Sequence, residues 1–406
     1  MPSADIQTEK ASGVTLAQSY TAGATYCGLK RKKGSLDLGM LYSQRPASAA
    51  GLFTTNKVKA APVVLSHENL FKTKGKARAV VVNSGSANAS VGKQGIKDAR
   101  EMAELAAEHL HLDPSEIMVA STGVIGVELP MGLIRTGIKK IEMSPDGGLS
   151  FARSIITTDL KTKEFATSST VNKKKFTIGG CAKGSGMIHP NLATMLSFIT
   201  TDAAVDPVFL DKCLRKAVDN SFNMITVDGD TSTNDSVFIF ANGASGVKIA
   251  PNTPAAAAFE KALSEVCTHL AIDIARDGEG AQKLITVRVE SARTQNDARM
   301  AAKTIASSNL VKSAVRGNDP NWGRVLAALG RSGADIDERK ITMHINAICT
   351  MDGGMPIPFY KEAAVAAMSE PEVTIRVQLG IGKYDATAWG CDLTEEYVRI
   401  NSSYTT

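Results

Sequence analysis

Short apolar runs alternate with longer segments of helical periodicity along the whole chain, and this alternation is the feature that most limits the possible folds. Residues 79–82 form an apolar run that ends at Asn83-Ser84-Gly85, as a strand does when it enters a turn. Residues 96–110 follow with apolar side chains at helical spacing. Because this alternation continues to the C-terminus, we predict an α/β (α+β) fold with sheets layered with helices.

The other elements are predicted from the same periodicities and from helix-start signals. Proline after Asp206 and after Thr253 marks a first helical position in both places. Asn318 or Asp319 is expected to cap a helix that starts near Pro320. Strands are expected at 116–120, 236–241, 284–290, 341–348 and 373–379, and helices at 207–218, 254–272, 293–308, 322–329 and 359–368.

The composition excludes several classes of protein. With 406 residues, 43% hydrophobic and 21% charged, the chain is neither collagenous, coiled-coil nor disordered in the main. A net charge of +5 is too small to indicate a nucleic-acid partner, and we read the lysines at 173–175 as a solvated turn or strand edge. No apolar run approaches the length of about 20 residues that crosses a bilayer, so no membrane partner is expected.

The six cysteines indicate a compartment rather than a site. No two of them form a C-x-x-C pair, which argues against a zinc site and a redox motif. The first twenty residues contain no apolar leader segment, and they include Asp5 and Glu9. We therefore expect a cytoplasmic protein with free thiols and no bound metal.

Residues 183–202, KGSGMIHPNLATMLSFITTD, carry the strongest chemical signal in the chain. The usual nucleophile elbow, zinc-protease motif and phosphate-binding loop are all missing from the sequence. Gly184 and Gly186 lead into His189-Pro190-Asn191, and Thr194 then stands immediately before an apolar run. A threonine in such a place suits attack by its own hydroxyl on the preceding carbonyl, which would cleave the chain between Ala193 and Thr194.

Cleavage there would leave Thr194 with a free α-amine. Such an amine has a pKa of about 7.7–8.0, so near neutral pH it can act as the base for the adjacent hydroxyl. One residue would then supply both nucleophile and base. The residues alone leave an alternative open, in which His189-Pro190-Asn191 is a plain turn and Thr194 an ordinary strand residue.

Eight blocks of sequence, in the right order, resemble the ornithine acetyltransferase family, whose members cleave themselves before the threonine of an A-T-M-L motif. The likeness covers essentially the whole chain and departs from the family pattern at Ser86 and Leu192, where Asn and Met are expected. The blocks are GSANA at 85–89, ASTGVIG at 120–126, TTDLKTKE at 157–164, KGSGMIHPNLATML at 183–196, VDGDTSTND at 227–235, GEGAQK at 278–283, NDPNWGR at 318–324 and DLTEEYVRINSSYTT at 392–406.

The resemblance implies a self-processing ornithine acetyltransferase-like fold. Residues 1–193 would be an α chain and residues 194–406 a β chain with an N-terminal Thr194, the two forming one intertwined catalytic fold. The α chain would carry a net charge of +10 and the β chain −5, which modestly favours their association. By analogy with the family, two α and two β chains would assemble into a heterotetramer.

The resemblance also implies an activity, that of an acyltransferase. A glutamate N-acetyltransferase moves the acetyl group of N2-acetyl-L-ornithine to L-glutamate in arginine biosynthesis, through an acetyl-Thr194 intermediate in a ping-pong scheme. The small-molecule substrates would be N-acetylornithine and glutamate, with no cofactor. Some members of the family also use acetyl-CoA as donor, and the sequence leaves this open.

The same resemblance assigns roles to single residues. Thr122 and Gly123 would form the oxyanion hole, because a glycine lets its backbone N–H approach a ligand closely. Lys183 would pair with the substrate carboxylate, and Glu279, which we expect in an exposed loop between two glycines, with the side-chain ammonium of ornithine. The substrate-binding set is Thr157, Lys183, Thr194, Glu279, Asn401 and Thr406.

Further expectations concern one loop, the C-terminal residues and two rival functions. Residues 227–235 lack the EF-hand pattern, and we expect a structured turn that helps to build the active site without a metal. The C-terminal residues must be tied down if they bind substrate. A hydrolase of the same self-processing fold would pass the acyl group to water, and a non-catalytic binding protein would keep the chain intact.

Overall fold

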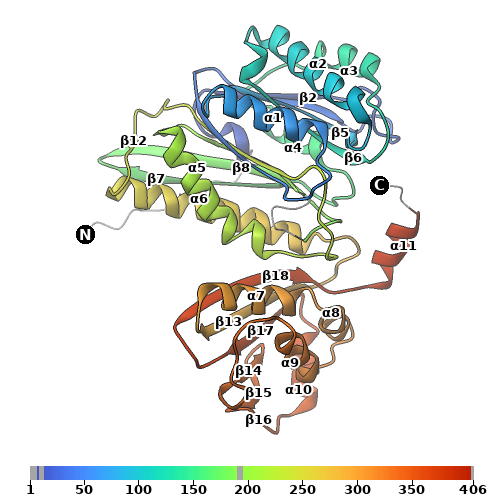
Figure 1. Ribbon diagram of the computed structural model, residues 1–406, viewed down its shortest axis with the longest axis vertical. Helices are drawn as coiled ribbons and strands as arrows, with labels where there is room; N and C mark the ends of the chain where they lie inside the picture. The colour runs from blue at the N-terminus through green and yellow to red at the C-terminus, as the bar shows by residue number, and fades with distance from the viewer. Residues whose placement is uncertain (1–6, 9–12, 190–194, 404–406) are drawn as a thin grey trace.

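The computed structural model describes residues 7–8, 13–189 and 195–403 (Figure 1). Ala193, Thr194 and Thr406 lie outside the described residues. The described chain forms an upper body, which contains two large sheets, and a lower lobe with a third sheet. The predicted α/β fold class is confirmed.

A four-stranded sheet forms the core of the upper part of the body. Its outer face packs against α1 (Ala61–Lys72), α2 (Gly92–Leu110) and α3 (Met131–Ile138) (Figure 1). Met102 and Ala106 of α2 contribute to this core because their spacing puts both on the buried helix face. The strands are, in sheet order, β2 (Tyr20–Thr25), β3 (Leu38–Ser43), β5 (Ala79–Ser86) and β6 (Ile117–Val124).

A six-stranded sheet lies below it, and α4 (Gly148–Ile155) contacts strands of both sheets. Phe151 of α4 meets Phe198 edge to face, with ring centroids 5.1 Å apart. The opposite face is covered by α5 (Pro207–Asp219) and α6 (Pro254–Arg276). The strands are, in sheet order, β1 (Gln7–Thr8), β7 (Lys163–Val171), β8 (Lys174–Lys183), β9 (Leu196–Thr201), β11 (Ser236–Ala241) and β4 (Ser48–Phe53).

The predicted cleavage point falls between two neighbouring strands of this sheet. β8 ends at Lys183 and pairs antiparallel with β9, which starts at Leu196. On the far side, β11 pairs with β4, so two strands from after residue 193 lie between strands from before it in one sheet. The two predicted fragments would thus share a hydrogen-bonded sheet and its core; the division itself stays a prediction.

The lower lobe is formed by residues that all follow the predicted cleavage point; several of its helices and strands were predicted, but their separation into a lobe was not. Its sheet packs against α7 (Gln295–Ala306), while α8 (Asn309–Arg316), α9 (Trp322–Gly330) and α10 (Lys361–Met368) complete the lobe. The chain then leaves the lobe in α11 (Glu395–Ser403). The strands are, in sheet order, β16 (Met355–Pro356), β15 (Ile348–Asp352), β14 (Thr342–Ile345), β17 (Glu372–Gln378), β13 (Leu284–Ala292) and β18 (Tyr384–Cys391), and a separate pair joins β10 (Ala204–Val205) to β12 (Lys248–Ile249).

Local signals predicted most helix starts and one turn correctly. Asp206 caps α5 by accepting hydrogen bonds from the backbone N–H groups of Val208 and Phe209, and Thr253 caps α6. The lysine-rich turn is also confirmed, because Asn172 and Lys173 have φ values of 49° and 65° between β7 and β8.

Two predictions from local pattern were wrong. Residues 341–348 do not form one strand: β14 ends at Ile345, Asn346 turns the chain with a φ of 51°, and β15 begins at Ile348. The alternating pattern runs through this tight hairpin and therefore hides it. The helix after Pro320 is capped by Asn321, which accepts from the N–H of Arg324, and not by Asn318 or Asp319.

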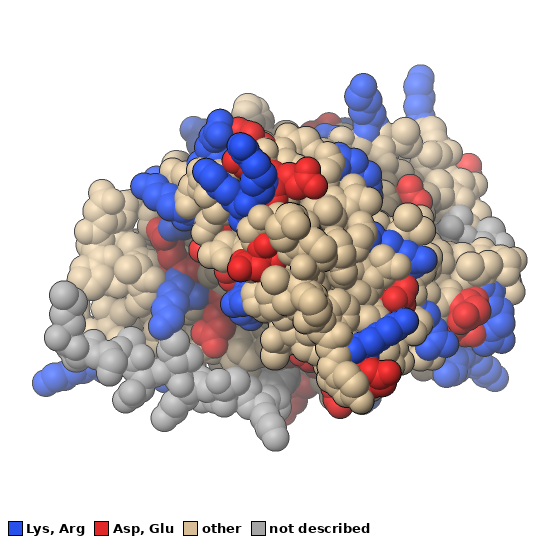
Figure 2. Space-filling view, turned by 90° about the horizontal axis from the view of Figure 1, so that it is seen from below, with Lys and Arg blue, Asp and Glu red and all other residues tan. Residues whose placement is uncertain are grey.

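Three general properties of the described residues are a lack of metal-binding clusters, a lack of membrane-spanning helices and, on one face, charges of both signs (Figure 2). Within the described residues, no group of three or more His, Cys, Asp or Glu side chains could hold a metal ion. Among the described helices, none combines the length and apolar character needed to cross a bilayer. Figure 2 shows Lys and Arg side chains interspersed with Asp and Glu on the face seen from below.

Candidate active site

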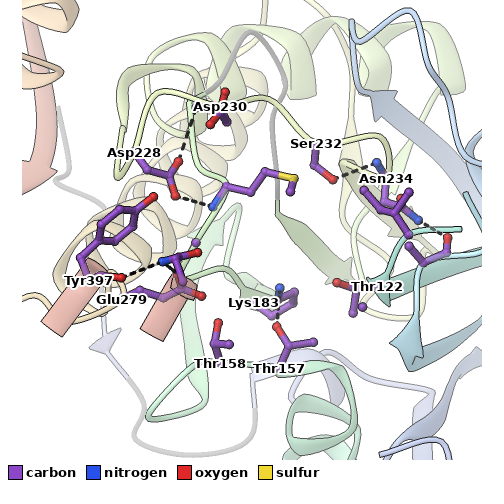
Figure 3. Close-up of a pocket in the computed structure, with 16 residues that line it drawn as sticks. Thr122, Thr157, Thr158, Lys183, Asp228, Asp230, Ser232, Asn234, Glu279 and Tyr397 are labelled. Atoms are coloured by element: carbon purple, nitrogen blue, oxygen red, sulfur yellow. Dashed lines mark hydrogen bonds between the residues drawn. The ribbon is translucent and has the colours of Figure 1, made fainter. Parts of the chain in front are cut away.

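A cavity of about 250 Å³ lies where the ends of β6 and β8 meet the loop after α6 and the helix α11 (Figure 3). Six of the residues predicted to form the site line it. Thr194 and Thr406, the other two, lie outside the described residues. The six are Thr122, Gly123, Thr157, Lys183, Glu279 and Asn401. The fold therefore brings together side chains that are up to 279 positions apart in the sequence.

Gly123 is required by the contact between β5 and β6. The parallel register sets Gly85 beside Gly123 and becomes irregular at Ser86, which pairs with both Thr122 and Val124. Gly123 has a φ of 129°, and a Cβ atom on it would lie 2.4 Å from the carbonyl carbon of Gly85. A side chain at position 123 would clash with the backbone of Gly85. The glycine therefore allows β5 and β6 to approach closely beside Thr122.

Asn234 holds this strand end in place. Its side-chain amide donates to the carbonyl oxygen of Ala87 at 2.6 Å and to that of Ser121 at 2.9 Å. Thr233 donates a hydrogen bond of 2.6 Å to the amide oxygen of Asn234. Because Asn234 is buried and comes from the 227–235 segment, it ties that segment to β6 and to the residue that follows β5. The predicted structured turn is confirmed, and sequence reasoning had missed Asn234 itself.

Lys183 is a buried cation at the end of β8. Only 4% of the residue is exposed, and its Nζ donates a hydrogen bond of 3.0 Å to Oγ1 of Thr157. Burial lowers the pKa of Lys183, and the nearby Lys163 adds to this effect. The carboxylates of Asp159, Asp235 and Glu279 oppose it.

Glu279 is buried, and the prediction of an exposed loop was wrong. Its exposed fraction is 7%, because its backbone N–H donates to the carbonyl oxygen of Ser185 and holds the loop against the residues that follow β8. Its carboxylate lies against the Cα of Gly186, where a Cβ atom would be only 2.4 Å from Cδ of Glu279. Asn401 of α11 donates to Oε2 of Glu279 at 2.8 Å.

Two further acidic residues, Asp228 and Asp230, and a tyrosine, Tyr397, also line the cavity. Asp228 accepts the backbone N–H groups of Met187 at 2.6 Å and Ile188 at 2.8 Å, which shapes the loop after β8. Burial, followed by the charges of Asp228 and Glu279, raises the pKa of Tyr397 well above its ordinary value. Figure 3 shows Thr122 and Glu279 on opposite sides of Lys183, so the cavity has an acidic side and a cation near its middle.

The residues on either side of the predicted cleavage point are anchored to the same segment. Met195, the first described residue after it, donates its N–H to Oδ1 of Asp235 at 2.8 Å. His189, the last described residue before it, accepts a hydrogen bond from Thr231 at its carbonyl oxygen. Burial, together with the charge of Lys303, lowers the pKa of His189 to about 4, so this imidazole is neutral at neutral pH.

Sequence reasoning also missed a buried ionic network beside Lys183, formed by Asp159, Lys163 and Asp277. The signal that could have found it is the 157–164 block, which contains Asp159 and Lys163 and holds more charged residues than a buried strand normally does. The network's third member comes from the end of α6, and no sequence pattern links it to the other two.

Together these features define an enzyme that acts on a small charged molecule. The cavity contains a buried cation, Lys183, and carboxylates on one side of it. The Thr122-Gly123 end of β6 lies on the other side (Figure 3), and these are the elements of such a site. A family model described as the ArgJ family matches residues 21–406. The chain therefore belongs to the ArgJ family, and the predicted resemblance is confirmed.

Individual relatives agree with this assignment. The arginine biosynthesis bifunctional protein ArgJ of Symbiobacterium thermophilum is 51% identical over 98% of this chain and 99% of its own length. That of Dehalococcoides mccartyi is 49% identical over 97% of both chains. The crystal structure of the bifunctional ArgJ protein from Bacillus halodurans is 46% identical, with a TM-score of 0.51, and covers 52% of this chain and 100% of that chain.

Proposed function

We propose that this protein is a glutamate N-acetyltransferase that moves the acetyl group of N2-acetyl-L-ornithine to L-glutamate in arginine biosynthesis. The observation that carries the proposal is one cavity, in a chain of the ArgJ family, that combines a buried cation, a buried carboxylate and the Thr122-Gly123 strand end. An N-acetylated amino acid with a cationic side chain matches these groups in charge and kind.

The enzyme first cleaves itself. The hydroxyl of Thr194 attacks the carbonyl carbon of Ala193, the amide nitrogen leaves as the amine of Thr194, and water hydrolyses the resulting ester. The products are chains of 193 and 213 residues. In support, the solved Bacillus chain is matched over its full length yet covers 52% of this chain, the share that residues 194–406 make up.

Acetyl transfer then proceeds in two halves. Thr194 attacks the acetyl carbonyl of N-acetylornithine while its α-amine takes the hydroxyl proton. The Thr122 hydroxyl and the Gly123 N–H stabilise the oxyanion, and the proton goes to the departing amine of ornithine. Glutamate then attacks acetyl-Thr194 with its own amine, which forms N-acetylglutamate and restores the hydroxyl. The cycle balances without a cofactor.

The substrate is held at both of its ends. Lys183 binds the α-carboxylate, and its location at the end of β8 supports this role. Glu279 binds the side-chain ammonium of ornithine, with Thr157, Asn401 and Thr406 completing the substrate site. Burial strengthens both charge contacts, because solvent screens them less than at the surface.

The word bifunctional in the relatives' names favours a second reaction, in which acetyl-CoA acetylates Thr194 in place of N-acetylornithine. Incubation with acetyl-CoA and glutamate would then release CoA thiol and form N-acetylglutamate. If the wild type released no more thiol than Thr194→Ala does, this second activity would be contradicted.

We further propose that two α and two β chains form a heterotetramer. We place it in the cytoplasm, a reducing compartment in which the six free cysteines would persist.

A denaturing gel tests the processing step most directly. The purified wild-type protein should give two bands, of 193 and 213 residues, and Thr194→Ala should give one band of 406. An intact wild-type chain would overturn the mechanism and favour a binding protein. An acetyl-transfer assay separates the remaining rival, because a hydrolase would release free acetate in place of N-acetylglutamate.

A further inference from the structure

Lys163, the first residue of β7, is a fully buried lysine that lies between two buried carboxylates. Its Nζ is 2.7 Å from Oδ1 of Asp159 and 2.6 Å from Oδ2 of Asp277. The side chains of Lys163 and Asp159 have no exposed surface, and that of Asp277 has 4%. A buried charge needs compensation, so each of these groups depends on the others.

Asp159 holds the residues on the cationic side of the cavity. It accepts the N–H of Thr157 at 3.0 Å and that of Gly184 at 2.7 Å. Thr157 is the hydrogen-bond acceptor of Lys183, and Gly184 is the next residue after Lys183 in the chain. The charges of Lys163 and Lys183 outweigh the effect of burial and hold the pKa of Asp159 below its ordinary value, so this carboxyl is ionised.

Asp277 connects the network to the acidic side of the cavity. It accepts the N–H of Leu160 at 3.1 Å, and its carbonyl oxygen accepts the hydroxyl of Ser185 at 2.7 Å. The carbonyl oxygen of Ser185 in turn accepts the N–H of Glu279. Lys163 precedes the proposed cleavage point and Asp277 follows it, so this ion pair also joins the two proposed chains.

The charges around Lys183 decide what its ammonium group can bind. Asp159, Asp235 and Glu279 are the acidic groups near it, and Lys163 and Lys30 are the basic ones. Lys30 already donates to the carbonyl oxygen of Leu36. Without Lys163, Lys183 would be left to compensate the negative charge of Asp159.

We propose that Lys163 is a positioning residue. Its positive charge compensates the negative charge of Asp159, so that Lys183 stays available to the α-carboxylate of the substrate. This inference rests on the proposed function, which assigns that carboxylate to Lys183. Lys163 itself does not line the cavity. Its effect is transmitted through Asp159 and Asp277 to residues on both sides of the bound amino acid.

Calorimetric titration of the processed protein, with both of its chains present, against two ligands tests the proposal. L-ornithine has an α-carboxylate, whereas putrescine is the same molecule without it. Lys163→Met should weaken ornithine binding about tenfold while putrescine binding stays within about twofold of wild type. Lys161→Met is the matched control: Lys161 lies two residues away, its side chain is 51% exposed, and it pairs with Asp273 at 3.8 Å. It should bind both ligands as the wild type does.

The pH dependence of ornithine binding is a second readout, which a merely structural role would not move. Lys163→Met removes a positive charge that lowers the pKa of Lys183, so the alkaline loss of affinity should move to higher pH. Asp159→Asn should move it to lower pH, because it removes an acidic group that raises that pKa. Asp159→Asn keeps the Lys163–Asp277 pair and serves as the second variant if Lys163→Met does not fold.

Three outcomes would count against the proposal. An equal loss of ornithine and putrescine affinity in Lys163→Met would show a general structural role and overturn it. An alkaline limb that stays in place in both network variants would also overturn it. If the wild type binds ornithine no better than putrescine and Lys183→Met changes nothing, the carboxylate role of Lys183 in the proposed function fails, and this inference fails with it.

Discussion

The side-chain amide of Asn401, in α11, donates a hydrogen bond of 2.8 Å to the carboxylate of Glu279, in the loop that follows α6. A second contact, from the hydroxyl of Thr394 to the carbonyl oxygen of Gly280, holds the start of α11 against the same loop. The C-terminal helix is thereby fixed to the acidic side of the cavity, although the residue Asn401 itself is exposed.

Extension of the C-terminus should therefore impair activity more than extension of the N-terminus. A tag after Thr406 would start three residues beyond Ser403, where α11 ends, and should disturb the Asn401–Glu279 contact and raise the KM for N-acetylornithine. The same tag before Met1 serves as the control. Equal kinetics for the two tagged proteins would reject the prediction.

Asn401→Ala should raise the KM for N-acetylornithine as well. Ser402→Ala is its control and should not, because it removes the hydrogen bond from Ser402 to the carbonyl oxygen of Arg399.

Replacement of Gly123 should abolish most of the activity. In Gly123→Ala the new methyl group would meet the backbone of Gly85, so the N–H of residue 123 turns away from the cavity. Loss of one oxyanion donor lowers kcat by about 100- to 1000-fold. Gly132→Ala is the control, because a Cβ atom there has no neighbour within 4 Å and α3 tolerates alanine. A kcat of Gly123→Ala within about tenfold of wild type would remove Gly123 from the mechanism.

Asn234→Ala should reduce both stability and kcat. It leaves the buried carbonyl oxygens of Ala87 and Ser121 without the donor that now satisfies them, at a cost of about 1–3 kcal/mol in the free energy of unfolding. The released strand end no longer presents Thr122 and Gly123 in one geometry. Chemical denaturation and steady-state kinetics measure the two effects. Asn220→Ala, which affects one exposed contact at the end of α5, should change neither; matching values for the two variants would refute the prediction.

Binding of the substrate carboxylate should weaken in alkaline solution. Burial and Lys163 lower the pKa of Lys183, so its ammonium loses a proton at a lower pH than an ordinary lysine does. The contribution of Lys183 to the kcat/KM for N-acetylornithine is then full below this lowered pKa and is lost as pH rises through it. Lys183→Arg keeps its charge throughout this range and should lose the alkaline decline, even at a reduced kcat/KM. An unchanged alkaline limb in Lys183→Arg would assign the decline to another group.

Local chemistry allowed much of the chain to be predicted from its sequence. The caps at Asp206 and Thr253, the 236–241 strand and the class of fold depend on neighbours a few residues apart, and the structure confirms them. The eight sequence blocks named the right family. The hairpin turn at Asn346 was missed because strand alternation does not change across so short a turn.

What the sequence by itself determined is therefore the class of fold, many of its helices and strands, the family and the residue types of the candidate site. Only the tertiary structure decided the environment of those residues, because burial and electrostatic interaction depend on which distant segments meet. Glu279 was expected in an exposed loop and is buried, since Ser185, Gly186 and α11 close around it. The pairing of Lys163 with Asp277, 114 positions apart, has no local signature, since only folding brings the two charges together.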